Sequence, residues 1–399
     1  MQFGSILRCS SRVCAVAAVG LSASVASAAG ITTLATFNST NGANPYAGLI
    51  LSGSTLYGTT TLGGANVYGT VFSVPITGGS PTTLATFDST NGAAPYAGLI
   101  LSGSTLYGTT SATGTNGEGT VFSVPLAGGT PTTLATFNST NGAYPYAGLI
   151  LSGSTLYGTT SGGGANSAGT VFSLPITGGS PTTLATFNNI NGANPQAGLI
   201  LSGNTLYGTA SHGGANNDGT VFSVPITGGT PTTLATFNST NGANSYAGLI
   251  LSGSTLYGTT LYGGANDAGT VFSVPVTGGS PTTLATFNNT NGTGPNAGLI
   301  LSGSTLYGTT YGGGANSVGT LFSLPITGGT PTTLATFDGT NGAYPLAGLI
   351  LSGGTLYGTT YYGGANGDGT VFSLAIPEPG GLTLLALGLP ALLRRRRAR

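Results

Sequence analysis

The acidic side chains are the residues of this sequence with the most potential for chemistry. Between residues 29 and 376 the chain has six acids and one histidine, with no Lys, Arg or Cys. Glu118, Asp218 and Asp368 stand at the same place in a 50-residue repeat, in its second, fourth and seventh copies. Two carboxylates about 5–10 Å apart can hydrolyse a glycosidic bond. A carbohydrate-active enzyme is therefore one hypothesis, but these copies are not neighbours, and we expect no catalytic residue and no enzyme.

Metal binding is the second chemistry to consider. The segments 38–42 and 88–92 are rich in Asn, Asp and Gly, as calcium loops are, but most copies have Asn where Ca²⁺ would require a carboxylate. Ordinary Asx turns explain such a pattern. His212 is a single imidazole, whereas zinc takes three or four protein ligands. We predict no metal and no cofactor.

The differences among the seven copies point to binding. They fall in two loops, near residues 44–46 and 61–68 of the first copy, and Tyr is frequent there. Tyr offers a large contact area at low entropic cost, and acids or amides add hydrogen bonds. A surface of this kind suits a glycan or an envelope protein, although unconstrained drift after duplication is an open alternative. The candidate binding residues are Tyr46, Tyr96, Tyr146, Tyr246, Tyr262, Tyr311, Tyr344, Tyr361, Tyr362, Glu118, Asp218 and Asp368.

Strands must position these loops, because each copy contains four strand-like segments. In the first copy they are residues 48–51, 55–60, 70–76 and 82–87, separated by clusters of Gly, Ser, Asn and Pro. Four strands in 50 residues are typical of a propeller blade. In an up-and-down blade the two variable loops share one face, and the nearly invariant turns lie on the other. Tyr57, which recurs in every copy, is predicted to pack in the core.

The two ends of the repeat array predict a closed ring. Residues 31–37 form a fourth strand that precedes the first copy, and the last copy stops at Ile376 after its third strand. The first segment can fill the vacancy in the last copy, which removes exposed strand edges. Residues 29–376 are therefore predicted to form an all-β, seven-bladed β-propeller of four-stranded blades. A β-solenoid is the alternative, but solenoid ends need distinct caps, and the sequence has none.

The repeat resembles a known family. Its units carry Gly48-Leu49-Ile50, then Leu56-Tyr57-Gly58-Thr59-Thr60, then Gly69-Thr70-Val71-Phe72. These motifs are similar to those of the GloVer tandem repeat, and the resemblance covers residues 31–376. It implies a surface protein with an interchangeable anchoring tail, and it implies no biochemical activity.

Residues 1–28 have the three parts of a secretory signal peptide. Arg8 and Arg12 precede the apolar segment 13–25, and Ala26-Ser27-Ala28 offers small residues for cleavage by signal peptidase before Ala29. An uncleaved anchor helix is the alternative. Either interpretation predicts export of the repeats.

Residues 377–399 have the order of a sorting tail. Pro377, Glu378 and Pro379 precede the apolar segment 380–393, and Arg394, Arg395, Arg396 and Arg397 follow it. The tail resembles the PEP-CTERM signal of Gram-negative bacteria, which implies processing by an exosortase-type enzyme and a link to exopolysaccharide. As a helix the apolar segment measures about 21 Å, short against a hydrocarbon core of ~30 Å. We therefore expect marginal or transient membrane anchoring; an ordinary membrane anchor is the alternative.

The charge of the repeats excludes one class of partner. A region without Lys or Arg cannot neutralise phosphates, so we expect no nucleic-acid binding. Taken together, the sequence predicts a non-enzymatic extracellular or cell-surface protein with a binding or structural role in the envelope or the exopolysaccharide matrix. A passive surface coat or spacer is the remaining alternative.

Overall fold

The computed structural model describes residues 30–376, and its regular structure consists of 28 short strands. Each strand is rich in Thr, Val, Leu or aromatic residues and ends at a turn that contains Gly, Ser or Asn. The strands are β1 (Thr32–Thr36), β2 (Ile50–Ser52), β3 (Thr55–Thr60), β4 (Thr70–Pro75), β5 (Thr82–Thr86), β6 (Ile100–Ser102), β7 (Thr105–Thr110), β8 (Thr120–Pro125), β9 (Thr132–Thr136), β10 (Ile150–Ser152), β11 (Thr155–Thr160), β12 (Thr170–Pro175), β13 (Thr182–Thr186), β14 (Ile200–Ser202), β15 (Thr205–Ala210), β16 (Thr220–Pro225), β17 (Thr232–Thr236), β18 (Ile250–Ser252), β19 (Thr255–Thr260), β20 (Thr270–Pro275), β21 (Thr282–Thr286), β22 (Ile300–Ser302), β23 (Thr305–Thr310), β24 (Thr320–Pro325), β25 (Thr332–Thr336), β26 (Ile350–Ser352), β27 (Thr355–Thr360) and β28 (Thr370–Ala375).

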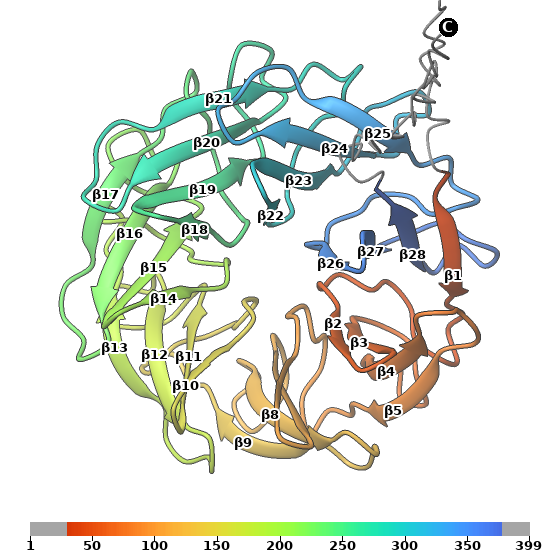
Figure 1. The fold of residues 1–399 in the computed structure, drawn as a ribbon. Helices are drawn as coiled ribbons and strands as arrows, with labels where there is room; N and C mark the ends of the chain where they lie inside the picture. The colour runs from red at the N-terminus through yellow and green to blue at the C-terminus, as the bar shows by residue number, and fades with distance from the viewer. Residues whose placement is uncertain (1–29, 377–399) are drawn as a thin grey trace, which may run out of the picture.

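The strands form seven antiparallel sheets of four, arranged as blades around a central axis (Figure 1). Blade 1 is β2 to β5, and blades 2 to 6 follow in chain order up to β25. In each blade the short first strand lies nearest the axis and the fourth lies at the rim. The fold is the seven-bladed β-propeller that the sequence predicts, and the β-solenoid alternative is wrong.

Blade 7 is built from the two ends of the array. The order of its strands is β1-β28-β27-β26, so the first strand of the chain completes the last blade. Thr33 lies opposite Phe372 in the antiparallel register. We call the pairing of β1 with β28 the seam. It confirms the predicted closure, which leaves no blade with a missing rim strand.

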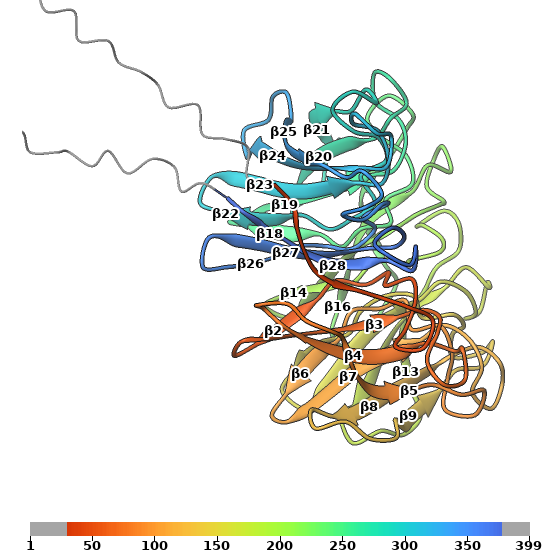
Figure 2. The same ribbon diagram turned by 90° about the vertical axis from the view of Figure 1, so that its right-hand side faces the viewer.

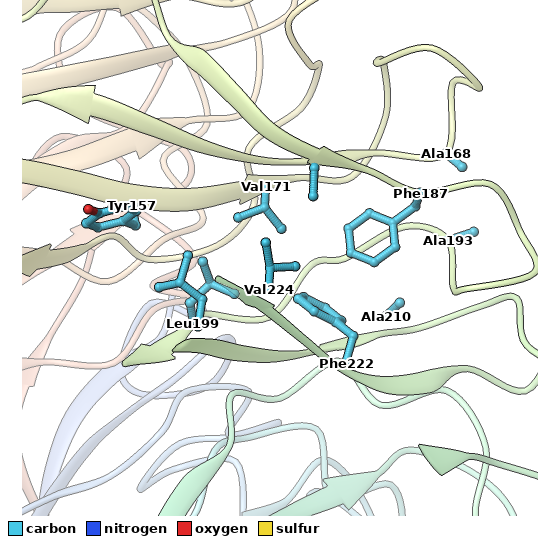
Figure 3. Packing of buried hydrophobic residues seen from close by; sticks show 11 residues of the cluster. Tyr157, Ala168, Val171, Phe187, Ala193, Leu199, Ala210, Phe222 and Val224 are labelled. Atoms are coloured by element: carbon cyan, nitrogen blue, oxygen red, sulfur yellow. The ribbon is translucent and has the colours of Figure 1, made fainter. Parts of the chain in front are cut away.

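Neighbouring blades are joined by aromatic pairs that recur around the whole ring. Phe37, which follows β1, meets Phe72 of blade 1 edge-on, with ring centroids 4.8 Å apart. Six equivalent pairs join the other blades. Figure 3 shows one such junction, in which Phe187 and Val171 of blade 3 pack on Phe222 and Val224 of blade 4. A buried Phe side chain contributes about 1.5–3 kcal/mol, and an edge-to-face pair adds about 0.5–1.5 kcal/mol.

Glycine is required where these rings cross the neighbouring strand. Gly58 lies opposite Phe72 in the register of β3 and β4. A Cβ at Gly58 would stand 2.7 Å from Phe72 Cζ and 2.9 Å from Leu49 Cδ2. The phenyl ring fills the space that a side chain would take, which explains why every copy has Gly at this place.

Hydrogen bonds between blades repeat with the same period. A bulge leaves Leu84 of β5 unpaired within its own sheet, and its carbonyl accepts a bond from the Gly129 amide of blade 2 at 2.9 Å. Near the axis, Thr59 donates to the Ala97 carbonyl at 3.1 Å. The equivalent bond from Thr359 to the Ala47 carbonyl at 3.2 Å crosses from blade 7 to blade 1 and so fastens the ring a second time.

The first strand of each blade differs from its prediction. The sequence predicts a strand over the apolar residues 48–51, whereas β2 begins at Ile50 and is only half-buried. Leu49, just before it, is the buried residue. The reason is that this strand is the innermost of its blade, so one side faces the axis, where no neighbouring blade covers it.

The two faces of the disc are unequal. Figure 2 shows it nearly edge-on, with longer loops on one side and tight hairpins on the other. Both ends of the described chain lie on the hairpin side, because β1 begins opposite the end of β28 and Ile376 bonds to the Gly354 carbonyl in a hairpin turn. Among residues 30–376, no helix could cross a membrane.

Candidate functional site

The loop face consists of two kinds of loop that interlock through backbone hydrogen bonds. Residues 37–49 connect blade 7 to blade 1, and in this loop Ala43 exchanges two bonds with Leu62, which lies between β3 and β4. The same connecting loop reaches back to blade 7, where the Asn44 amide donates to the Asp368 carbonyl at 2.8 Å. The pattern recurs around the ring. The two variable loops therefore share a face, as the sequence predicts.

Buried threonines support these loops from below. The hydroxyls of Thr60 and Thr70 are 2.8 Å apart, and Thr60 also donates to the Leu62 carbonyl at 2.9 Å. Five other blades repeat the pair. Blade 4 lacks it, because Ala210 stands in place of the first threonine and leaves Thr220 with the Asn191 carbonyl as its partner.

One position of each connecting loop has a left-handed backbone. Asn suits this conformation, and Asn194 and Asn244 also donate their side-chain amides to the carbonyls of Ser161 and Ser211. Tyr at the same place cannot form that bond, and its left-handed backbone costs about 1–3 kcal/mol. The seven residues are Asn44, Ala94, Tyr144, Asn194, Asn244, Gly294 and Tyr344, with φ between 53° and 61°.

A ring of side chains from all seven blades surrounds the axis on the loop face. It lines a pocket of about 170 Å³ together with the Ala-Gly pair that follows in each copy. We call these seven side chains the axial ring. They are Tyr46, Tyr96, Tyr146, Gln196, Tyr246, Asn296 and Leu346. The sequence analysis lists four of these tyrosines with the other variable residues, and the structure places these four around the axis. The sequence contains an indication of this axial position, because the residue directly precedes the invariant Ala-Gly that leads into the innermost strand.

The axial ring is polar at its walls. Asn296 donates its amide to the Tyr46 hydroxyl at 3.4 Å, and its buried Oδ1 has no partner among the described residues. Burial raises the pKa of Tyr46, and it does the same for Tyr146 and Tyr246. These phenols therefore keep their protons at all physiological pH values and can donate hydrogen bonds.

Seven of the predicted tyrosines form one continuous line of aromatic contacts across the loop face. We call them the tyrosine track. In the order of their contacts they are Tyr311, Tyr344, Tyr362, Tyr361, Tyr46, Tyr96 and Tyr146.

The track changes character along its length. Consecutive ring centroids are 4.6–6.0 Å apart, and the first contact, between Tyr311 and Tyr344, is stacked while the others are edge-to-face. The rings of Tyr311 and Tyr362 are 41% and 47% exposed. The other five rings are half-buried. The track thus leads from an open aromatic surface into the polar pocket.

Two predicted tyrosines stand apart from the track. Tyr246 belongs to the axial ring, and Tyr262 is 51% exposed on a loop of blade 5. Neither makes a ring contact with another aromatic residue in the described part of the chain. The sequence places all of these residues on one face, but only the structure shows which of them meet.

Each of the three equivalent acids accepts a hydrogen bond from a serine of its own blade. The Ser139 hydroxyl donates to Glu118 at 2.5 Å, Ser239 donates to Asp218 at 3.3 Å, and Ser39 donates to Asp368 at 3.1 Å. Each bond ties two loops of one blade together. The acids belong to blades 2, 4 and 7, none of which is next to another. The structure therefore does not assemble a pair of these carboxylates.

The comparisons with known proteins agree with this architecture. A family model described as the Gloeobacter/Verrucomicrobia repeat matches residues 20–222 and 202–387. The chain belongs to the Gloeobacter/Verrucomicrobia repeat family. No curated protein has a matching sequence.

Two solved structures show the same fold as this Gloeobacter/Verrucomicrobia repeat protein. The extracellular domain of a candidate hybrid two-component system from B. thetaiotaomicron is 12% identical, with a TM-score of 0.55. The match covers 87% of this chain but only 40% of the length of that one. A candidate 6-phosphogluconolactonase from Bacteroides uniformis is 15% identical, with a TM-score of 0.52, over 82% of this chain and 97% of its own. At these identities the likeness concerns the fold alone.

The Asx-rich loops of the repeat are turns. Asp88 accepts bonds from the Thr90 hydroxyl and from the amides of Thr90 and Asn91, at 2.6–2.9 Å. Asn38 makes the same bonds in its copy. These hydrogen bonds, led by the one from Thr90, lower the pKa of Asp88. An amide serves as well as a carboxylate here, which accounts for the mixture of Asn and Asp.

His212 is the other residue that the sequence analysis considers for metal binding. His212 is half-buried, with Nδ1 2.9 Å from the Ser211 hydroxyl. Within residues 30–376 no three His, Cys, Asp or Glu side chains gather in a way that could hold a metal ion. The predicted signal peptide, residues 1–28, and the sorting residues of the tail, 377–399, lie outside the described residues.

Proposed function

We propose that this protein is an exported, non-enzymatic repeat protein of the bacterial cell surface, which binds in the envelope or the exopolysaccharide matrix through its loop face. One observation carries the proposal. Seven nearly identical blades keep their variation on the loop face, and both ends of the ring lie on the opposite face. A tail at the hairpin face would hold the loop face outward, toward a partner.

The location is supported by several independent features. Residues 1–28 have the pattern that signal peptidase recognises. The tail from Pro377 onward is the substrate we propose for an exosortase-type enzyme, with marginal anchoring by its apolar segment before processing. One of the solved propellers is an extracellular domain. The resemblance of the repeats to the GloVer family also implies a surface protein.

The chemistry of the loop face supports the non-enzymatic part of the proposal. The repeats contain neither Lys nor Cys, and the loop acids that could form a catalytic pair lie in separate blades and accept bonds from serines. The axial pocket is lined by Tyr, Ala and Gly with two amides and one Leu. A pocket of that kind can bind polar groups, and its lining offers neither a carboxylate nor an imidazole as a general base.

Cell fractionation tests the proposal. The full chain, expressed in a Gram-negative host that carries an exosortase, should be found at the surface or in the medium, with Ala29 as its first residue and with the tail removed. Retention of the protein in the matrix fraction, rather than its free diffusion into the medium, distinguishes a binding protein from a passive coat. Protein that stays in the cytoplasm with residues 1–28 intact, or purified protein that hydrolyses a polysaccharide, would contradict the proposal.

A further inference from the structure

We propose that the tyrosine track binds an extended chain of neutral sugars, whose end enters the axial pocket. The inference rests on the proposed function and gives its loop face a ligand class and a site. Three observations carry it: the continuity of the track, the hydrogen-bonding groups at its inner end, and the charge of the repeats.

The continuity of the track fits a linear ligand. The apolar C–H face of a pyranose packs on an aromatic ring, and a line of tyrosines in mutual contact offers several such rings to a ligand that extends along it. Tyr311 and Tyr362 are the exposed rings, and Tyr344 holds its ring between them. Tyr combines a rigid apolar ring with a hydroxyl, so it can pack on a sugar and bond to it at once.

The inner end of the track fits a group rich in hydroxyls. The pocket of about 170 Å³ is smaller than the ~300–1,000 Å³ of sites that enclose whole drug-sized ligands. It can therefore receive one end of a ligand, not the whole. Asn296 offers a buried carbonyl oxygen without a partner, and Tyr46 offers a hydroxyl that burial keeps protonated. Together they supply an acceptor and a donor for sugar hydroxyls.

The charge of the repeats selects a neutral glycan. Residues 29–376 carry six acids and neither Lys nor Arg, so the face repels anionic polysaccharides. A protein partner would ordinarily find complementary charges or a large apolar core at its interface. Beyond the tyrosines, the large apolar side chains that the described loops expose are Leu62, Val67 and Ile190, and the charges there are acids alone. For this reason we favour the glycan.

Natural differences among the blades provide matched controls. Tyr344 and Tyr144 have the same left-handed backbone, but only Tyr344 belongs to the track. Replacing either by Asn restores the residue that three other blades have. Tyr362 and Tyr262 occupy equivalent exposed positions, and again only the first is in the track. All four substitutions occur at surface positions that tolerate change in other copies.

The experiment is titration calorimetry of the full chain with neutral hexasaccharides of glucose, mannose and N-acetylglucosamine, and with hexagalacturonate as the anionic probe. We expect at least one neutral probe to bind and hexagalacturonate not to bind. Tyr344→Asn and Tyr362→Ala should each weaken binding about tenfold, as expected when one aromatic contact is removed from a small interface. Tyr144→Asn and Tyr262→Ala should bind within about twofold of the unmodified chain.

Three results would overturn the inference. Equal affinity in the track variants and their controls would refute the track, while the proposed surface role would stand. Tighter binding of hexagalacturonate would refute the choice of a neutral ligand. Binding of no probe by a chain that is still retained in the matrix fraction would point to a protein partner. Failure of the proposed function itself would be seen separately, as protein that is never exported.

Discussion

The seam offers a test of how the ring is held together. Phe37 and Phe237 have the same surroundings: each is fully buried and meets the next blade's Phe edge-on, with a centroid distance of 4.8 Å and an interplanar angle of 69°. Each also donates its amide to a Gly carbonyl at 3.0 Å. The difference is connectivity, because β17 continues from β16 through a turn, whereas β1 reaches β28 only across the seam.

Replacing either Phe by Ala should therefore lower the free energy of unfolding by the same amount, but the two variants should differ in which strands open locally. Removing a buried Phe costs about 3–5 kcal/mol, which includes the cavity left behind. Since the contacts match, the two variants should lose equal free energy of unfolding in urea titrations. In Phe37→Ala, however, β1 can detach without unfolding a hairpin, so the ring can open locally.

Hydrogen exchange distinguishes the two variants. The amides of β28 in Phe37→Ala should exchange through local opening, faster than those of β16 in Phe237→Ala, which should exchange only through larger openings. Phe37→Ala should also aggregate on storage, since an open β28 is an unpaired edge. Equal exchange in the two strands would refute the idea that the seam is the weak point of the ring. Unequal loss of equilibrium stability would refute the assumption that the blades are equivalent.

Further predictions concern single sites, each measured by chemical denaturation. Gly58→Ala should destabilise the protein by about 1–3 kcal/mol, because the new Cβ overpacks the Phe72 ring. Ala210→Thr should stabilise it by about 0.5–1.5 kcal/mol, by giving Thr220 the buried hydroxyl partner found in the other blades; no gain would mean that blade 4 has repacked. Asp88→Asn should leave stability at neutral pH unchanged but reduce its loss in acid. The pKa of Asp88 is lowered from 3.8 on folding, so its contribution is present above that pH and disappears as the pH falls through the folded value.

The sequence predicts the blade well because strand boundaries follow turn residues. The second strand of the first copy is found at the predicted residues, and the others agree within one or two residues. The bulge at Leu84 could not be predicted, because the hydrogen bond that its carbonyl accepts comes from Gly129 of the next blade. Strand β2 begins late for a similar reason, because its position at the axis is a property of the ring.

The candidate site is predictable in its membership but not in its arrangement. Within-chain variation finds the tyrosines, yet it cannot show that Tyr361 of blade 7 meets Tyr46 of the loop into blade 1, because those residues are related only by closure. It also cannot show that Glu118, Asp218 and Asp368 each accept a hydrogen bond from a serine in another loop.

The contacts that join the blades and the positions that vary among the copies involve different residues, which explains how such a ring can diversify. Blades are joined by backbone carbonyls and amides, by the repeated Phe pairs and by Thr59 and its equivalents, all of which recur in every copy. The loops are joined by their backbones, as in the two bonds between Ala43 and Leu62. The side chains at the variable positions add single hydrogen bonds in some blades, as Asn194 does, and backbone strain in others, as Tyr344 does. A duplicated blade can change its loop residues without weakening its neighbours, so the tyrosine track can be altered one ring at a time while the propeller stays closed.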